Sequence, residues 1–497
     1  MIEKLNETYS LVTGLKDPEK LVEFLKVQKP DAYFNKMIKL GFESPFKFFT
    51  AKFRNGLMVY NGHRFLLKSF GIEPLDESSG VSDQEISDFL KSVELPFEPY
   101  DYQIQTVRKC LTQNKVLIRS CTGSGKSLSI SLILEFFRRK GLKGILVVPN
   151  INLLTQFRND IESYGLQELL KEVQILGDGN QSDFKTSVTI TTWQSMVEHI
   201  DRIHPDFIIC DEAHRETAEV TSSILTKSVN TKIKLGFTGT LPEDPVAKMM
   251  ILGLFGEPFT VITSKQLIER GLATPLKIKT LMLNYPKSEC ALFREFPDYQ
   301  KQLKFIKEHE ARNKAITDIV TTLRTKGLNT LVLFQHTEHG KQIFSDLVSR
   351  LYPEIKLESK DITGKKSLEF QKGINLYFMN GEQSGAVRES QRNIIETVEG
   401  GVIVANYAVM GTGVNMKNLH CLVLASPLKA FTTVSQSLGR LMRKHKSKKE
   451  AVIFDIVDNL GKNCVFMKQY RHRVQMSYIP EEFEIQTIQV NLGTVKK

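Results

Sequence analysis

The chain has 497 residues, 41% of them hydrophobic and 25% charged, which is typical of soluble globular proteins built from two to four domains. Its net charge of +11 favours a polyanionic partner, although basic proteins without nucleic acid are common. The six cysteines form no CxxC pair, 18 apolar residues never run together, and the N-terminus lacks an apolar signal core; we therefore expect no disulfide framework, no membrane contact and a cytoplasmic location.

Residues 1–95 are rich in Phe and Lys, as in the stretch 46–54, and carry no motif of nucleotide chemistry. Ser82, at the end of a polar loop, is a candidate cap for the helix that follows. We expect a small α+β accessory domain here. Its Phe residues would by default form a small core, and DNA binding is the alternative.

From about residue 100, short apolar strands alternate with helical stretches, the pattern of parallel-sheet α/β domains. A linker-like stretch at 264–279 separates two such sets, and the second set has no phosphate-loop motif of its own. We predict two similar sheets that share one nucleotide: domain 1 over 96–278, domain 2 over 279–458, and a C-terminal extension over 459–497. The predicted strands are 116–118, 145–148, 188–191, 207–210 and 235–238, then 330–334, 376–379, 402–405, 421–425 and 452–455.

A Gly-rich turn at 120–127 follows the first of these strands and opens a helical stretch. Such a loop surrounds a triphosphate with backbone N–H groups and the Lys126 ammonium, while the Ser127 hydroxyl can ligate Mg²⁺. Ser120 stands where a strict motif has its first Gly. The pattern predicts an ATP and Mg²⁺ site whose loop residues are Thr122, Gly123, Ser124, Gly125, Lys126 and Ser127.

The strand 207–210 ends in Asp-Glu-Ala-His at 211–214. Charged tetrapeptides also begin ordinary helices, but this one follows a buried strand, and parallel strands present ligand-binding groups at their carboxyl ends. We expect Asp211 to hold the metal through water and Glu212 to polarise the attacking water. Together the two motifs predict an ATPase.

Arg440 and Arg443 are spaced i and i+3, so one helical face presents both guanidinium groups. They predict arginine fingers that reach across a domain cleft to the transferring phosphate, against the alternative of a basic helix surface. Residues 238–240, Thr-Gly-Thr, either link nucleotide state to the second domain or form only a turn.

Gln103 precedes the phosphate loop and is a candidate for the adenine edge, although a surface helix position is the ordinary alternative. The single Trp, Trp193, is interpreted as a core residue. The flanking Thr192 and Ser195 hydroxyls are candidates for phosphate contacts with a nucleic acid.

The order of these motifs over residues 98–458 resembles superfamily 2 nucleic-acid helicases and translocases, which implies two RecA-like domains. The resemblance implies that Gln103 reads adenine and that 238–240 couples the domains. It also places Gly411 and Gly413 at the nucleotide. The nucleic-acid contacts that it implies are Pro149, Asn150, Thr192, Ser195 and Thr412.

The motif at 436–443 looks more like the duplex-DNA branch of that superfamily. The compact size, the short N-terminal module and the sequence at 454–459 look closest to phage UvsW-type branch-migration helicases. That type implies ATP-driven remodelling of forks and Holliday junctions in recombination, repair or replication, in the host cytoplasm. We expect a monomer on branched DNA. The Lys-rich segment 356–372 departs from the type. Two alternatives stay open: a duplex translocase without strand separation, and a P-loop ATPase that does not act on nucleic acid.

Overall fold

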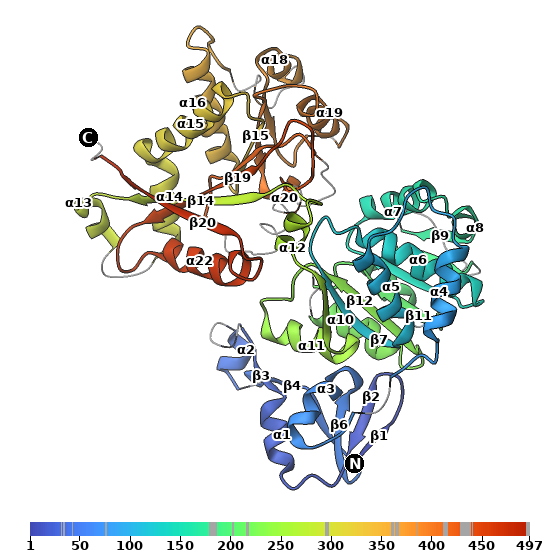
Figure 1. The fold of residues 1–497 in the computed structure, drawn as a ribbon. Coiled ribbons are helices and arrows are strands. Elements are labelled where there is room, and N and C mark those ends of the chain that lie inside the picture. Colours follow the sequence, from blue (N-terminus) through green and yellow to red (C-terminus); the bar gives the residue numbers. More distant parts are fainter. Residues whose placement is uncertain are drawn as a thin grey trace. The chain divides into compact units, whose positions relative to one another are not determined.

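The computed structural model describes residues 1–30, 32, 35–41, 43–74, 77–177, 186–200, 203–214, 218–293, 298–358, 362, 367–383, 385–410, 416–427, 439 and 441–493. By their internal contacts they divide into two units, Met1–Ile262 and Thr263–Lys497 (Figure 1). Within these described residues, no helix is both long enough and apolar enough to cross a membrane.

The first unit begins with a small module that mixes short strands and helices (Figure 1). An antiparallel sheet runs in the order β1-β2-β6-β5, and β3 pairs with β4 beside it. This confirms the predicted N-terminal α+β region. Its strands are β1 (Ile2–Lys4), β2 (Tyr9–Val12), β3 (Lys26–Gln28), β4 (Phe46–Phe48), β5 (Thr50–Phe53) and β6 (Gly56–Tyr60), and its helices are α1 (Pro18–Phe24), α2 (Lys36–Lys39), η1 (Asn61–His63), α3 (Arg64–Leu67) and η2 (Lys68–Phe70).

The module and the parallel-sheet domain of the first unit share one hydrophobic core, in which Leu21 and Val59 of the module pack with Phe255. The His63 imidazole lies 2.7 Å from the Met249 carbonyl oxygen of α11 (Pro245–Phe255), and burial lowers the pKa of His63 to about 4. The neutral imidazole therefore donates to that carbonyl. The module is a packed part of the first unit, and its buried Phe49, Leu57 and Leu67 side chains belong to the shared core.

The remainder of the first unit is a seven-stranded, all-parallel sheet in the order β13-β7-β12-β11-β8-β10-β9. Parallel strands are buried on both faces, which explains the apolar runs in the sequence. All five strands predicted for this sheet are present. The strands are β7 (Lys115–Ser120), β8 (Gly144–Val148), β9 (Val173–Leu176), β10 (Val188–Thr192), β11 (Phe207–Cys210), β12 (Ile233–Thr238) and β13 (Pro258–Ile262), and the helices besides α11 are α4 (Asp83–Ser92), α5 (Asp101–Thr112), α6 (Lys126–Arg139), α7 (Ile151–Ser163), α8 (Gln167–Lys171), α9 (Trp193–His199) and α10 (Ala218–Lys227).

The second unit holds another seven-stranded parallel sheet, in the order β16-β17-β15-β18-β19-β14-β20. The two sheets confirm the predicted tandem arrangement. The strands are β14 (Leu276–Asn284), β15 (Thr330–Phe334), β16 (Leu376–Met379), β17 (Val402–Asn406), β18 (Cys421–Leu424), β19 (Ala451–Asn459) and β20 (Glu484–Asn491), and the helices are α12 (Ser264–Glu269), α13 (Lys287–Cys290), η4 (Ala291–Phe293), α14 (Tyr299–Glu308), α15 (Glu310–Thr325), α16 (Thr337–Leu351), α18 (Ser367–Ile374), α19 (Gly385–Ile395), α20 (Tyr407–Met410), α22 (Val465–Arg473) and η5 (Val474–Tyr478).

The stretch 264–279 is not the linker that the sequence suggested, because it contains α12 and the start of β14. Lysines alternate with buried residues at the start of β14, which hid the strand from a search for apolar runs. The C-terminal segment adds β20 to the edge of the same sheet, and Arg473 of α22 pairs with Asp455 of β19 at 2.8 Å. The segment is thus folded onto the second unit.

Candidate functional site

Three neighbouring parallel strands, β7, β12 and β11, deliver the candidate catalytic residues to one edge of the first sheet. Because carboxyl ends of parallel strands share an edge, the loop after β7 and the acidic residues after β11 lie beside each other. Lys126 Nζ is 3.6 Å from Glu212 Oε1, which shows that the two predicted motifs meet.

The loop between β7 and α6 is shaped by two glycines in left-handed conformation, Gly123 at φ +90° and Gly125 at φ +78°. Gln103 of α5 lies directly over this loop, and its Nε2 donates to the Ser124 carbonyl oxygen at 3.1 Å. A Cβ on Gly125 would stand 2.4 Å from that Nε2. Gln103 therefore supports the loop backbone, a role that the adenine prediction did not include.

Two serine hydroxyls are hydrogen-bonded across the loop, and one of them belongs to Ser120, which stands where a strict motif has its first Gly. Ser120 Oγ and Ser124 Oγ lie 2.6 Å apart, and Ser124 Oγ donates to the Cys121 carbonyl oxygen at 2.8 Å. Ser120 is buried, so these bonds satisfy its side chain without water. The departure at Ser120 is compatible with a phosphate loop.

The Lys126 ammonium is held within the site by two groups of the protein. It donates to the Ser120 carbonyl oxygen at 3.3 Å and forms the ion pair with Glu212. Burial opposes its charge, but the Glu212 and Asp211 carboxylates outweigh burial and raise the pKa of Lys126. The lysine is thus a cation, as phosphate binding requires.

The acidic motif is joined to the turn after β12 through His214. His214 Nδ1 lies 2.7 Å from Thr238 Oγ1, and the Ala213 N–H donates to the Phe237 carbonyl oxygen at 2.9 Å. Glu212 has a φ of +48°, a left-handed conformation that side-chain-bearing residues rarely adopt. Such strain is concentrated at functional sites, and here it is consistent with the catalytic role predicted for Glu212.

Sequence reasoning missed Tyr164, whose hydroxyl lies 2.8 Å from Ser127 Oγ. Tyr164 follows the end of α7, far from the loop in sequence, and no spacing rule indicates the contact. The residues present fit ATP and Mg²⁺: the first turn of α6 has no acidic side chain, the Lys126 ammonium lies beside the Glu212 and Asp211 carboxylates, and the hydroxyl of Ser127 belongs to the next residue of the helix.

The predicted nucleic-acid contacts of the first unit lie at the ends of two adjacent strands, β8 and β10. Asn150 caps α7 by accepting from the Leu153 N–H at 3.2 Å, and Thr192 caps α9 by accepting from the Ser195 N–H at 3.4 Å. Pro149 directly precedes the Asn150 cap. The two caps leave helix N-termini at this edge, where backbone N–H groups favour phosphate oxygens. Trp193 is fully buried, which confirms that it is a core residue.

Of the residues predicted in the second unit, the structure describes Arg443, whose carbonyl oxygen accepts from Thr274 Oγ1 at 3.1 Å. Arg440, Gly411, Thr412 and Gly413 lie outside the described residues.

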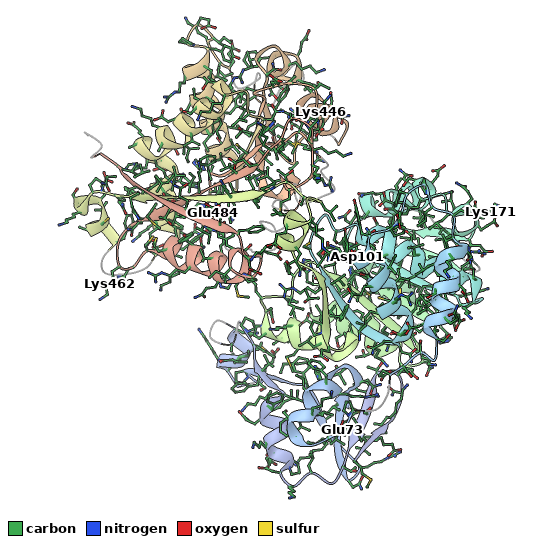
Figure 2. All side chains as sticks on the ribbon, viewed as in Figure 1. Glu73, Asp101, Lys171, Lys446, Lys462 and Glu484 are labelled. Carbon is green, nitrogen blue, oxygen red and sulfur yellow. The ribbon has the colours of Figure 1, made fainter. Side chains whose placement is uncertain are left out.

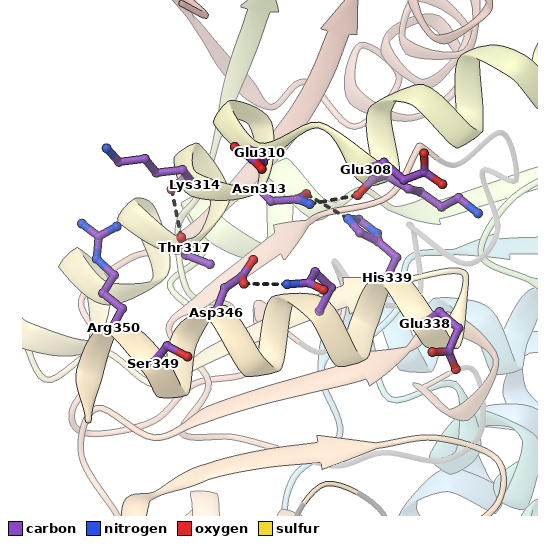
Figure 3. A pocket seen from close by; sticks show the side chains of 12 residues that line it. Glu308, Glu310, Asn313, Lys314, Thr317, Glu338, His339, Asp346, Ser349 and Arg350 are labelled. Carbon is purple, nitrogen blue, oxygen red and sulfur yellow. Dashed lines mark hydrogen bonds between the residues drawn. The ribbon is translucent and has the colours of Figure 1, made fainter. Parts of the chain in front are cut away.

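The second unit also has an open hollow of about 910 Å³ between α15 and α16, and no predicted site residue lines it (Figure 3). Asn313 and the buried His339 meet at its wall, with 3.2 Å between Oδ1 and Nε2, and burial lowers the pKa of His339 to about 3. Both signs of charge line the hollow, including Lys314, Arg350 and Asp346.

Comparison with known proteins adds an independent finding. Residues 96–243 match the family of the type III restriction enzyme res subunit. The chain is 31% identical over 420 residues to the ATP-dependent DNA helicase uvsW of Enterobacteria phage T4, covering 81% of this chain and 78% of that protein.

More distant relatives share most of the same region. The DNA 3'-5' translocase XPB2 of Sulfurisphaera tokodaii is 24% identical, over 72% of this chain and 81% of that protein. A fragment of a putative HsdR subunit of a type I restriction enzyme from Vibrio vulnificus has a similar fold, with a TM-score of 0.57, 16% identity, and coverage of 83% of this chain and 72% of that one.

Proposed function

The chain belongs to the family of the phage DNA helicase uvsW and is an ATP-dependent DNA helicase of superfamily 2, and we propose that it remodels branched DNA. The proposed substrates are forks and Holliday junctions, and the proposed outcome is branch migration in recombination, repair or replication. We further propose that it acts as a monomer in the host cytoplasm. The observation that carries the proposal is the 31% sequence identity between this chain and that helicase, which extends over 81% of this chain.

In this proposal ATP is hydrolysed at the site on the carboxyl edge of the first sheet. Lys126 and the loop N–H groups bind the phosphates, Ser127 and Asp211 hold Mg²⁺, and Glu212 orients the attacking water. Bound Mg²⁺ supplies charge that neutralises the phosphate oxygens. The support is the 3.6 Å approach of Lys126 to Glu212, which requires both motifs to share one site.

The proposed partners of this site in the second unit are Arg440 and Arg443, with Gly411 and Gly413 near the nucleotide. Because these residues and the phosphate loop belong to different units, hydrolysis would depend on closure of the two units on ATP. Arg443→Ala should then lower kcat while ATP binding stays nearly intact. A loss of ATP binding alone would instead assign a structural role to Arg443.

The proposed DNA contacts are Pro149, Asn150, Thr192 and Ser195 in the first unit and Thr412 in the second. Contacts of this kind go to the backbone, so binding should be independent of sequence and sensitive to salt. The module formed by residues 1–95 is proposed to assist DNA binding, as the alternative to a purely structural role. It holds 13 Lys and Arg against 14 Asp and Glu, so the net positive charge of the chain lies outside this module.

The test is a steady-state ATPase assay with no nucleic acid, single-stranded DNA, linear duplex, forked DNA, four-way DNA and RNA. We expect the strongest stimulation from branched DNA, and Lys126→Ala should abolish hydrolysis in every tube. Equal rates in all tubes with the wild-type protein would refute the proposed DNA function. Normal turnover by Lys126→Ala would refute the site.

A second candidate is a duplex translocase that moves without separating strands, favoured by the similarity to the XPB2 translocase. A strand-displacement assay run beside a triplex-displacement assay distinguishes the two. Displacement of the third strand without separation of the duplex would select the translocase.

A further inference from the structure

A basic loop in the second unit, residues 444–449, has no part in the ATP site or in the predicted DNA contacts. Three of its lysines, Lys444, Lys446 and Lys449, are exposed, and we call them the basic platform (Figure 2 labels Lys446). Within the part of the chain that the structure describes, none of the three forms an ion pair. Their charges are therefore available to a ligand.

The backbone that carries the platform is fixed from both sides. On one side, the Thr274 N–H donates to the Met442 carbonyl oxygen at 2.7 Å. On the other, Lys448 Nζ donates to the carbonyl oxygens of Lys417, Leu419 and Leu441 at 3.1, 3.1 and 2.7 Å. Lys448 thus serves as an internal anchor, and the platform lysines project from a pre-organised loop.

The platform borders a hollow of about 520 Å³ in the second unit. Ile268, Ala273 and Pro275 give its lining an apolar part, and lysines of the loop line it as well. A lining that combines apolar and cationic side chains suits a ligand that presents sugars and phosphates together, as a nucleic-acid backbone does.

The platform lies at the amino edge of the second sheet. Residues 444–449 are separated from β19 by one residue. Thr274, whose N–H donates to the Met442 carbonyl oxygen just before the loop, lies two residues before the start of β14. Both strands run parallel in register from Leu276 and Ala451, so the platform lies at the amino ends of the strands. β14 has nine residues and spans about 30 Å at roughly 3.3 Å per residue, so the platform is that far from the carboxyl edge.

We propose that the basic platform binds the phosphate backbone of a second arm of branched DNA. The proposal rests on the proposed function. The DNA contacts proposed for that function follow the carboxyl ends of strands, where parallel sheets place their ligands. Within the second unit, the platform lies at the opposite edge of the sheet from the carboxyl ends of the strands, and a fork or junction has a further arm that can occupy such a separate surface.

Lysine ammonium groups act as point charges toward phosphates, so the platform contributes affinity through counterion release and without base recognition. Each phosphate contact contributes about −0.9 to the slope of log affinity against log salt. Loss of three contacts should therefore lower the magnitude of that slope by about 2 to 3 on branched DNA.

The experiment compares the full-length wild-type protein with the triple variant Lys444→Gln, Lys446→Gln, Lys449→Gln. Fluorescence anisotropy measures binding to a four-way junction, a fork, a short linear duplex and a short single strand between 50 and 200 mM salt. A matched control removes three exposed lysines elsewhere in the second unit, Lys301, Lys304 and Lys372, as Gln substitutions.

We expect the platform triple to weaken junction and fork binding roughly tenfold or more at 0.1 M salt and to reduce the salt slope, with linear duplex and single strand unchanged. A second triple with Arg at the platform positions should retain branched-DNA binding. Thermal unfolding should be unchanged, because exposed side chains are replaced.

Three outcomes would overturn the proposal. They are an equal loss on every DNA, an equal loss in the control triple, or a higher KM for ATP with DNA binding intact, which would place the lysines at the nucleotide. If the wild-type protein itself binds junctions no better than linear duplex, the branched-DNA function fails as well. If it prefers junctions and the triple keeps that preference, the platform alone is refuted.

Discussion

Substitution of Gly125 by Ala should damage the phosphate loop through two separable effects. Gly125 has a φ of +78°, and an added Cβ would stand 2.4 Å from Gln103 Nε2. The left-handed conformation costs a side-chain-bearing residue about 1–2 kcal/mol. The steric conflict displaces Gln103 from the Ser124 carbonyl and removes a hydrogen bond worth about 1 kcal/mol.

The summed cost of about 2–3 kcal/mol falls on the loop conformation that Gln103 supports, so it should weaken ATP binding by roughly 30- to 150-fold. A double-mutant cycle separates the two effects. In a Gln103→Ala background the Cβ has no amide to displace, and Gly125→Ala should cost only the backbone term, or about 10-fold in affinity.

The assay is equilibrium binding of a fluorescent ATP analogue to the four proteins of the cycle. Gly141→Ala is the matched control, because Gly141 has a φ of +70° with nothing within 4 Å of the added Cβ and lies beyond the end of α6. It should lose about 1 kcal/mol of stability and no ATP affinity. The reasoning is refuted if Gly125→Ala binds within threefold of wild type, or if the penalty is identical in both backgrounds.

Three further predictions concern stability and metal binding. Burial lowers the pKa of His63 to about 4, so between pH 6.5 and pH 4 this side chain stays neutral in the folded protein while it becomes protonated in the unfolded chain. The contribution of His63 to the free energy of unfolding should therefore fall by up to about 3 kcal/mol over that range. The stability difference between wild type and His63→Gln in urea should shrink accordingly, and growth of that difference would contradict the prediction. Arg312→Met removes the guanidinium that lies 2.7 Å from Asp458 and leaves this fully buried carboxylate without its ion-pair partner. The second unit should lose about 3–5 kcal/mol of stability in denaturant unfolding, and most of that loss should be recovered when Asp458→Leu is added. Tyr164→Phe removes the hydroxyl that orients Ser127 and should raise the Mg²⁺ concentration for half-maximal nucleotide binding about tenfold, whereas binding without Mg²⁺ stays unchanged; tighter Mg²⁺ binding would show that Tyr164 blocks the metal.

Much of the fold was predictable because parallel strands are buried on both faces and read as apolar runs. All ten strands predicted from such runs are present, from β7 to β19. In the two seven-stranded sheets, the edge strand β16 was predicted in this way, whereas the edge strands β9, β13 and β20 and their neighbour β14 were not. β20 is largely exposed, and β14 alternates lysines with buried residues, so neither has the composition of a central strand.

The candidate site was predictable where one short motif carries both the backbone shape and the chemistry, as at 120–127 and 211–214. The contacts that stabilise the site were not predictable. Tyr164 reaches Ser127 across 37 positions, and Gln103 reaches Ser124 across 21. Such contacts depend on how helices pack around the sheet, which no local pattern encodes.

These contacts also define what binding of a nucleotide must change. Lys126 is paired with Glu212 and Ser127 with Tyr164, so the groups proposed for phosphate and metal already have partners within the protein. A ligand gains only the difference between the new interactions and the ones that it replaces. Release of Glu212 from Lys126 would free its carboxylate to orient water. The proposed base would therefore become available only when phosphate occupies the lysine, which would limit unproductive chemistry and link occupancy of the loop to the His214–Thr238 contact behind it.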